Sequence, residues 1–216
     1  MLRYKQIIFD FDGTLSDSYP SFVKAMKTVM QRYGIEKSAE EIYLLLKKYS
    51  TAYVFDTCGF GEFKSDAKRQ FRELSDELLR SEATPMAGAE NILRFIAENG
   101  GYSYIYSHSG DIVLSNVKRW GLEGYFQDYQ LGDTEFPRKP APDALLNLMK
   151  KNGLNADECV MVGDRDIDIL AGKNAGVAGI LMDTEGYYPQ LSVEYRISEL
   201  KDIQDCLSAC TKKMHE

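Results

Sequence analysis

Two aspartates separated by a single residue directly follow the first apolar segment of the chain. Residues 6–9 are largely apolar, which predicts a buried strand, and Asp10 and Asp12 come next. Because alternate residues of an extended chain point the same way, both carboxylates are expected at the carboxyl end of this strand, where Gly13 lets the chain turn away. Like charges this close need a cation or a shared proton. A plain polar turn between a strand and a helix is the alternative.

A second acidic pair follows another apolar segment, residues 159–162. Asp164 lies at the end of this expected strand, and Asp168 lies one helical turn further on. In a parallel sheet, Asp164 lies at the same edge as Asp10. Three carboxylates that converge there form a hard oxygen site, which suits a magnesium ion that keeps some of its waters. The alternative is an acidic helix start, which the helix dipole stabilises.

Polar side chains also follow two other segments. Residues 102–106 lead into Ser107-His108-Ser109-Gly110, whose hydroxyls and backbone N–H groups can hold an anion at the start of the next helix. Lys139 lies in a loop that Pro140 and Pro142 stiffen, so a fixed ammonium group there can neutralise carboxylate and ligand charge. Taken singly, Ser107 is equally typical of a helix N-cap, and Lys139 of a solvated lysine.

The four groups together predict chemistry on a phosphate. Magnesium and Lys139 would bind the anionic oxygens, and Ser107 with backbone N–H groups would hold the remainder. One carboxylate would attack phosphorus in line while a second transfers the proton. This divides hydrolysis into two displacements through an acyl phosphate, as expected for a carboxylate nucleophile.

The segments that must position these groups alternate between strands and helices. Short apolar runs predict strands, and the helical patterns between them end at glycine. A strand-then-helix repeat predicts an α/β fold with a doubly wound parallel sheet of the Rossmann-like kind. The expected strands are residues 6–9, 102–106, 159–162 and 179–182, with a weaker extended stretch at 129–131; the expected helices are 89–98, 111–120, 142–152, 167–174 and a tail helix near 200–211.

Residues 16–84 break this alternation, because they hold consecutive helical patterns without a convincing strand. Ser18 is expected to cap the first helix, with Pro20 in its first turn. Ser38 and Glu41 form a capping-box pattern ahead of the second. The segment therefore predicts a small helical bundle inserted after the first strand.

The length of 216 residues suits one large domain that carries a smaller insert. We expect an α/β core domain of residues 1–15 and 85–216 and an inserted α-helical domain of residues 16–84. The 26 basic against 33 acidic residues give a net charge of −7, which argues against a nucleic-acid partner. No apolar run approaches the roughly 18 residues of a membrane span, and the start lacks the apolar stretch of a secretory signal. A cytoplasmic protein without a membrane partner is expected.

The motifs that carry these groups resemble those of the haloacid dehalogenase superfamily of phosphohydrolases, and the resemblance covers nearly the whole chain. The first motif is specific because it ends an N-terminal apolar strand. The matching residues are Asp10-Phe11-Asp12-Gly13-Thr14, Ser107, Lys139 within Lys-Pro-Ala-Pro, and Gly163-Asp164 with Asp168.

The resemblance implies a role for each matching residue. Asp10 would be the nucleophile and Asp12 the general acid and then the general base. Magnesium would be bound by Asp10, the main-chain oxygen of Asp12, and Asp164, with Asp168 supporting it directly or through water. The residues expected to contact substrate or phosphate are Gly13, Thr14, Ser107, His108 and Lys139. For His108, a local hydrogen bond is at least as good an interpretation as a substrate contact.

In this family a mobile helical cap occupies the position of the insert, closes over the site and contacts the leaving group. Residues 15–20 are similar to the corresponding stretch of phosphoglycolate phosphatases. The expected function is therefore magnesium-dependent hydrolysis of a small phosphorylated metabolite by a monomer or homodimer.

Two other functions remain open. A sugar phosphomutase similar to β-phosphoglucomutase would use the same aspartyl phosphate. A non-enzymatic phosphate-binding protein, or a signalling protein similar to a receiver domain, would use similar acids, hydroxyl and lysine, but a receiver domain would leave the insert of residues 16–84 unexplained.

Overall fold

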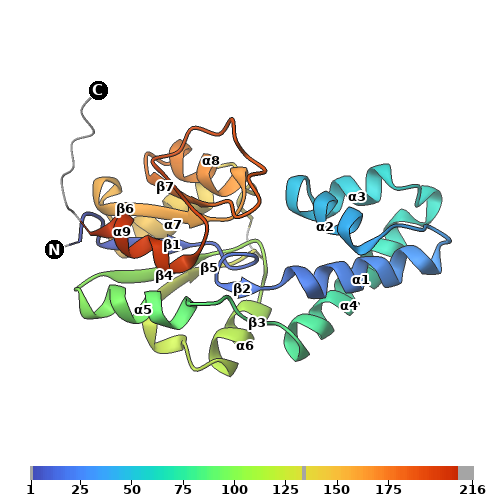
Figure 1. Ribbon diagram of the computed structural model, residues 1–216, viewed down its shortest axis with the longest axis horizontal. Helices are drawn as coiled ribbons and strands as arrows, with labels where there is room; N and C mark the ends of the chain where they lie inside the picture. The colour runs from blue at the N-terminus through green and yellow to red at the C-terminus, as the bar shows by residue number, and fades with distance from the viewer. Residues whose placement is uncertain (1, 133–134, 209–216) are drawn as a thin grey trace. The chain divides into compact units, whose positions relative to one another are not determined.

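The computed structural model of the protein describes residues 2–132 and 135–208 (Figure 1). Contacts between Cα atoms divide the chain into two units. The first unit consists of Met1–Leu15 and Pro85–Glu216, and the second of Ser16–Thr84. The second unit is thus an insertion between the first strand of the first unit and the rest of that unit.

The first unit is built on a parallel sheet. Among the residues that the structure describes, six strands form this sheet in the order β5-β4-β1-β6-β7-β8, and every neighbouring pair is parallel. Along the chain, β4 and β5 are added on one side of β1, and β6, β7 and β8 are then added on the other side. The strand order therefore reverses between β1 and β6. This doubly wound α/β arrangement confirms the expected fold class. The strands are β1 (Gln6–Phe9), β4 (Tyr102–Tyr106), β5 (Phe126–Gln130), β6 (Cys159–Gly163), β7 (Ala178–Met182) and β8 (Tyr195–Ile197).

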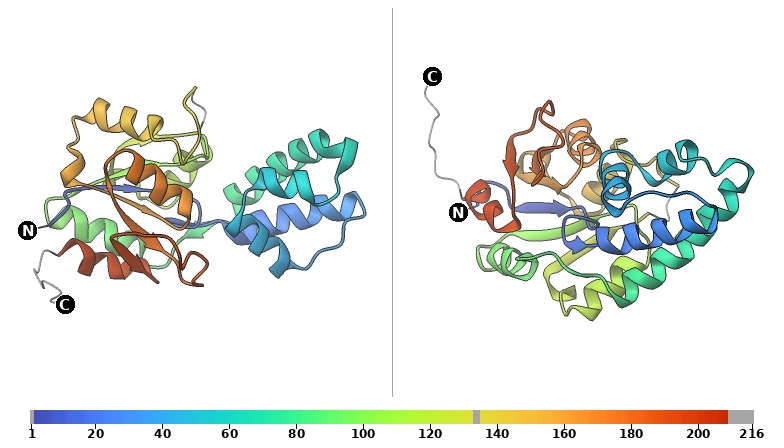
Figure 2. Two further views of the ribbon diagram at one scale, coloured as in Figure 1. Left: turned by 90° about the horizontal axis from the view of Figure 1, so that it is seen from above. Right: turned by 45° about the vertical axis from the view of Figure 1, so that its right-hand side comes forward.

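Helices cover both faces of this sheet (Figure 2). Ile8 and Met161 belong to a buried cluster that includes Leu145 of α7 and Ala171 of α8. Because side chains alternate along a strand, Ile7, which is fully buried, points to the opposite face. The helix α5 contacts β4 and α9. The helices of this unit are α5 (Ala89–Glu98), α6 (Ile112–Arg119), α7 (Asp143–Asn152), α8 (Asp166–Asn174) and α9 (Ile203–Leu207).

Three features of this unit differ from the sequence prediction. The weak extended stretch at 129–131 is part of β5, which begins earlier, at Phe126. The edge strand β8 was not predicted, because three residues are too few to show an alternating pattern. The predicted tail helix is a 3₁₀ turn at Leu200–Asp202 followed by α9, and residues 209–211 of that prediction lie outside the described residues.

The second unit is a helical bundle with its own apolar core. Its helices are α1 (Tyr19–Arg32), α2 (Ala39–Lys48), α3 (Thr51–Thr57) and α4 (Lys64–Ser81). The core includes Met26 of α1, Ile42 of α2, Val54 of α3 and Phe71 of α4, all of them buried. Consecutive helices that share one core explain why the sequence of this segment shows helical periodicity without a strand pattern.

The helix starts in this bundle test the predicted caps. The capping box is confirmed, since the Glu41 N–H donates to Ser38 Oγ at 3.1 Å and the Ser38 N–H donates to Glu41 Oε2 at 2.8 Å. The expected Ser18 cap is wrong. Ser18 precedes α1, but its backbone is already helical at φ −94° and ψ −20°, and its side chain makes no capping hydrogen bond. A capping side chain requires the extended backbone that Ser38 has.

The two stretches of chain that connect the units pair with each other. Strand β2 (Ser16–Asp17) and strand β3 (Thr84–Pro85) form a two-stranded sheet. Next to it, the Met86 N–H donates to the Leu15 carbonyl oxygen at 2.8 Å. The chain therefore leaves the first unit and returns to it at neighbouring positions.

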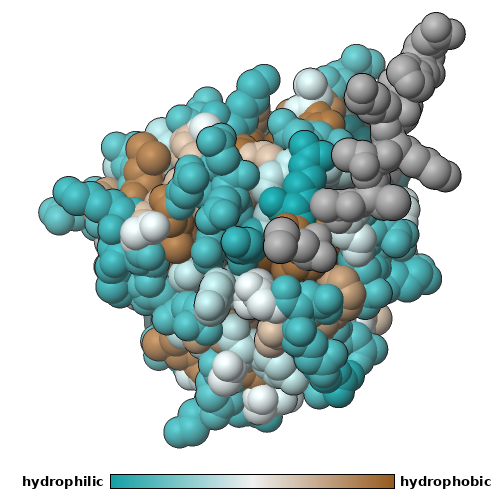
Figure 3. Space-filling view, turned by 90° about the vertical axis from the view of Figure 1, so that its left-hand side faces the viewer, coloured by the Kyte–Doolittle hydropathy of each residue, from teal (hydrophilic) through white to brown (hydrophobic). Residues whose placement is uncertain are grey.

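The surface is mostly polar on the face that Figure 3 presents, where hydrophilic side chains surround small separate hydrophobic patches. None of the helices in the described part of the chain is long and apolar enough to cross a membrane.

Candidate active site

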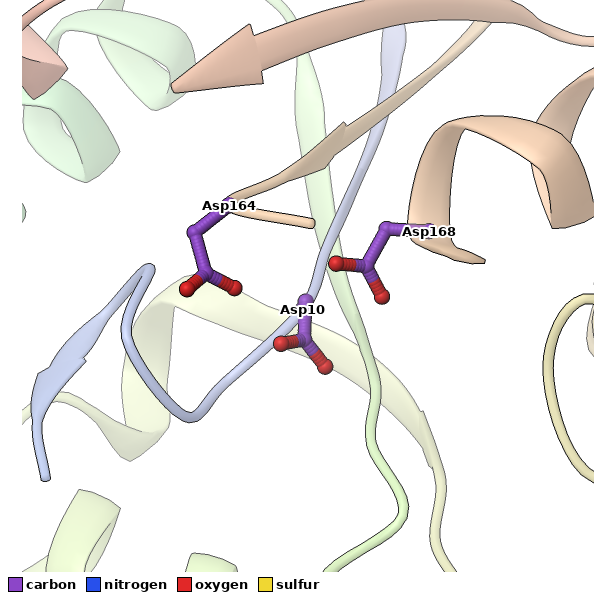
Figure 4. Close-up of side chains that lie close together, drawn as sticks. All are labelled: Asp10, Asp164 and Asp168. Atoms are coloured by element: carbon purple, nitrogen blue, oxygen red, sulfur yellow. The ribbon is translucent and has the colours of Figure 1, made fainter. Parts of the chain in front are cut away.

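Three buried carboxylates meet at the carboxyl edge of the sheet, where the strand order reverses. The pairing of Phe9 with Val162 aligns the ends of β1 and β6, and the Asp10 N–H donates to the Val162 carbonyl at 2.8 Å. Asp164 follows β6, and Asp168 lies in the first turn of α8. Figure 4 shows the three aspartates gathered at this edge. One oxygen from each lies within 4.8 Å of the others.

The close approach of Asp168 to β6 depends on a glycine. A Cβ atom on Gly163 would lie 2.3 Å from the Cβ atom of Asp168, which no side chain permits. Asp168 is held there by both of its oxygens. Oδ2 accepts from the Arg165 N–H at 3.1 Å, and Oδ1 accepts from the Lys139 ammonium at 2.9 Å. These two hydrogen bonds fix the orientation of the Asp168 carboxylate.

The Lys139 ammonium group connects β1, β4 and α8. Nζ donates to Asp10 Oδ1 at 2.7 Å, to the Tyr106 carbonyl oxygen at 2.7 Å, and to Asp168 Oδ1 at 2.9 Å. An ammonium group has three protons, so these three acceptors use all of them. The side chain is only 2% exposed. Lys139 is therefore a fixed charge inside the site and not the solvated loop lysine that was the alternative.

The charges of the cluster do not balance. Burial, followed by the nearby Asp168, raises the pKa of Asp10 well above its ordinary value, although Lys139 acts in the opposite direction. Burial alone would lower the pKa of Lys139, but Asp10 and Asp168 outweigh burial and raise it. Three carboxylates face one ammonium group, which leaves an excess of negative charge. A divalent cation fits this excess, and carboxylate oxygens are the donors that a hard cation prefers.

Asp12 lies two residues beyond Asp10 and is held from another loop. The Ser109 hydroxyl donates to Asp12 Oδ2 at 2.5 Å. Directly after Asp12 the chain turns at Gly13, whose φ of 78° belongs to the left-handed region that favours glycine. The hydroxyl of Thr14 is buried and has no hydrogen-bond partner among the described residues. The first motif thus forms a tight turn at the edge of the acidic cluster.

Ser107 is buried at the end of β4 but is not a helix cap. Its Oγ accepts from the Ser109 N–H at 3.0 Å, and its own N–H donates to the Gln130 carbonyl at 3.0 Å. The residue that precedes α6 is Asp111. The N-cap alternative for Ser107 is therefore excluded, and these bonds fix its backbone next to Tyr106, whose carbonyl binds Lys139.

His108 contacts the loop that carries Lys139 (the lysine loop). Its Nε2 accepts a hydrogen bond from the backbone N–H of Lys139 at 2.8 Å. Burial, followed by the positive charges of Lys139, Arg138 and Arg165, lowers the pKa of His108 to about 3. The ring is therefore neutral at neutral pH, as an acceptor must be. Of the two interpretations of this residue, the local hydrogen bond is the one for which the structure gives a partner.

The lowered pKa predicts how acid affects stability. In the unfolded chain His108 titrates near 6.5, whereas in the folded protein its pKa is about 3. The unfolded state therefore binds more protons between these values. The contribution of neutral His108 to the free energy of unfolding is complete above about pH 6.5. It is lost as the pH falls toward the pKa of His108 in the folded protein. At pH 5 the expected loss is up to about 2 kcal/mol.

Denaturant unfolding at pH 7.5 and pH 5 measures this loss, with His108→Gln as the control because glutamine does not titrate. The single tryptophan, Trp120, stacks on Phe11 at 5.7 Å and reports the first unit by fluorescence. We expect the wild type to lose more stability than the control. Equal losses in the two proteins would contradict a buried neutral histidine.

The structure brings together most of the residues predicted from the sequence. Ion pairs link Asp10 and Asp168 to Lys139, and Asp164 lies within the same acidic cluster. Two contacts were not predicted. The Ser109 hydroxyl, expected as an anion donor, binds Asp12, and the Tyr106 carbonyl binds Lys139. Nothing in the sequence indicates a backbone carbonyl.

Comparisons with known proteins identify the family to which the chain is similar. The model of the haloacid dehalogenase-like hydrolase family matches residues 7–182, which include the whole cluster. The phosphoglycolate phosphatase of Vibrio parahaemolyticus is 29% identical over 198 residues, which are 85% of each chain. A 5′-nucleotidase of Pseudomonas aeruginosa is 25% identical over 83% of this chain and 82% of its own.

Solved structures share the fold. A haloacid dehalogenase superfamily hydrolase of subfamily IA from Geobacter sulfurreducens has a TM-score of 0.73 at 22% identity, over 95% of this chain and 97% of its own. At this identity the likeness concerns the fold alone. The family match, by contrast, spans most of the sequence and all of the clustered carboxylates. The chain therefore belongs to the haloacid dehalogenase-like hydrolases, a family of enzymes.

Proposed function

We propose that the protein is a magnesium-dependent phosphatase that hydrolyses a small phosphate monoester through an aspartyl phosphate on Asp10. The observation that carries this proposal is the contact of Lys139 Nζ with Asp10 Oδ1 at 2.7 Å, beside two other buried carboxylates. A buried carboxylate held by a fixed ammonium at the edge of a cation site has the position and the charge environment of a nucleophile toward a phosphate dianion.

In the first step, a carboxylate oxygen of Asp10 attacks phosphorus and the bond to the ester oxygen breaks. Lys139 orients Asp10 and lowers its pKa against the opposite effect of burial, since the ammonium group contributes charge and direction together. Asp10, the main-chain oxygen of Asp12, and Asp164 would hold the magnesium ion, with Asp168 supporting it. When bound, magnesium supplies positive charge to the phosphoryl oxygens and lowers the repulsion between the dianion and the carboxylates.

Asp12 serves both steps in this proposal. Its protonated carboxyl group gives a proton to the departing ester oxygen, which leaves as an alcohol. Its carboxylate then takes a proton from the water that attacks phosphorus, and Asp10 is released with inorganic phosphate. The hydrogen bond from Ser109 to Asp12 Oδ2 supports this role, because a group that transfers a proton twice needs a fixed position.

The remaining phosphate contacts come from the loops next to these acids. Ser107 and the turn at Gly13 and Thr14 are the proposed donors to the phosphoryl oxygens. The buried Thr14 hydroxyl without a partner among the described residues supports this assignment, since buried donors are normally satisfied. His108 is better explained by its hydrogen bond to Lys139 than by a phosphate contact.

The relatives and the insert support the proposed substrate class. The relatives named above are a phosphoglycolate phosphatase and a 5′-nucleotidase, both of which act on small phosphate monoesters by name. We assign the second unit, residues 16–84, the role of a cap that contacts the leaving group. Phosphoglycolate is the first compound to test.

Assay of the purified protein with p-nitrophenyl phosphate, phosphoglycolate, nucleoside 5′-monophosphates and hexose phosphates tests the proposal. With magnesium we expect steady release of inorganic phosphate. Chelation by EDTA is expected to lower the rate at least about 100-fold, because a bound metal contributes several kcal/mol to such a transition state. Conversion of a hexose phosphate into its isomer without phosphate release would identify a mutase instead.

A binding measurement separates the metal site from the catalytic reaction. Magnesium should raise the thermal unfolding midpoint of the wild type, because an ion that binds only the folded state stabilises it. The Asp164→Asn variant removes one buried ligand charge and should show a smaller rise. Folded protein that releases no phosphate from any compound, with or without magnesium, would contradict the proposed function.

A further inference from the structure

His108 contributes a feature that the catalytic scheme above does not use. The segment Tyr106–His108 holds Lys139 at both ends of its side chain. At one end, Lys139 Nζ donates to the Tyr106 carbonyl at 2.7 Å and lies 4.3 Å from the centre of the Tyr106 ring. At the other end, the backbone N–H of Lys139 donates to His108 Nε2 at 2.8 Å. The two contacts come from residues separated by a single position in the chain.

The backbone of the lysine loop has few other donors with which to fix itself. Pro140 and Pro142 have no N–H group. The Ala141 N–H donates within the loop, to the Arg138 carbonyl at 3.0 Å. The N–H of Lys139 is therefore the backbone donor that ties this loop to the end of β4, and it belongs to the same residue as the ammonium group.

The imidazole ring is itself well fixed. It packs edge-on against the Tyr106 ring, with 6.5 Å between ring centres and an angle of 89° between the planes. The backbone on either side of it is bonded to β5 and the residues that follow. The Ser107 N–H donates to the Gln130 carbonyl at 3.0 Å, and the Gly132 N–H donates to the Ser109 carbonyl at 3.1 Å. A ring anchored in this way can set the position of the loop that it contacts.

We propose that His108 is a positioning residue that fixes the backbone of Lys139, and through it the ammonium group that orients Asp10. The proposal rests on the phosphatase function proposed above, and it assigns His108 no contact with substrate. Lys139 must meet three acceptors at 2.7 to 2.9 Å from one loop. Displacement of a catalytic group by about 1 Å can cost about 100-fold in rate, so a bond that fixes the backbone next to that group affects turnover.

Two variants of similar size separate positioning from packing. The amide oxygen of glutamine reaches about as far from Cα as Nε2 of histidine, so His108→Gln keeps an acceptor, whereas His108→Leu has none. We expect His108→Leu to lower kcat about 10- to 100-fold with less than about threefold change in KM, and His108→Gln to retain kcat within about threefold. Both variants should unfold at similar temperatures. Equal kcat values for the two variants would overturn the proposal.

NMR tests the hydrogen bond without any reaction. The ring nitrogens should show the tautomer that is protonated on Nδ1, with Nε2 as the acceptor. The Lys139 amide should be protected from exchange in the wild type and in His108→Gln, and should lose protection in His108→Leu. If the wild type releases no phosphate, the proposed function fails, and amide protection alone decides the positioning role. A proton on Nε2, or equal protection in both variants, would overturn it.

Discussion

The Asp10→Asn variant is expected to lose at least about 1,000-fold in kcat for phosphate monoester hydrolysis, which corresponds to about 4 kcal/mol of transition-state stabilisation. Asparagine has nearly the same shape, but its amide does not form an acyl phosphate. The substitution also removes the negative charge that Lys139 Nζ contacts at 2.7 Å. A labelled phosphate should be trapped on the wild-type protein and not on the variant.

A control for this variant lies at the other end of β6. Asp157 is exposed and precedes β6, on the edge of the sheet opposite the acidic cluster. The Asp157→Asn variant makes the same change of charge and should keep the wild-type rate. If Asp10→Asn retained a tenth or more of the wild-type rate while the control behaved as expected, Asp10 would not be the nucleophile.

The Lys139→Ala variant is expected to lose at least about 30-fold in kcat/KM, or about 2 kcal/mol, because it removes a preorganised charge. The side chain is 2% exposed and contacts both Asp10 and Asp168, so water cannot replace it easily. Without the ammonium group, the pKa of Asp10 should rise further, since Lys139 is the group that lowers it. A protonated Asp10 is a poor nucleophile.

The size of the lysine side chain needs its own control. Lys139→Met fills more of the space that alanine leaves, so a similar loss in both variants attributes the effect to charge and not to a cavity. Lys150→Ala removes an exposed lysine from the end of α7 and should leave the rate unchanged. Thermal unfolding of each variant shows that the rates refer to folded protein. A wild-type rate in folded Lys139→Ala would exclude Lys139 from the site.

The edge at which the site forms was predictable because topology, and not local propensity, determines it. Once the apolar runs are taken as parallel strands, their carboxyl ends must share an edge, and the residues that follow them must meet there. This reasoning placed Asp10 and Asp164 in one cluster although 153 positions separate them. The roles assigned to these residues stay proposals until the variants above are measured.

The features that the sequence did not predict are contacts of backbone atoms, very short elements and the backbone angles at one helix start. Lys139 binds the carbonyl oxygen of Tyr106, and His108, for which a local hydrogen bond was one interpretation, binds the N–H of Lys139. Every residue carries a carbonyl group, and every residue except proline carries an N–H group, so no residue type indicates these partners. Strand β8 and helix α3 have three and seven residues, too few to show a period. Ser18 has the right residue type for a cap but the wrong backbone angles, which depend on how α1 begins.

The hydrogen bond between Leu15 and Met86, beside the pairing of β2 with β3, has a consequence for how such proteins diversify. A segment whose two ends are adjacent can be exchanged, extended or removed as a cassette while the strand order around it is kept. Genetic recombination, or an engineer who grafts a different insert between these positions, can therefore replace the unit proposed as the cap without rebuilding the edge of the sheet where the acidic cluster lies.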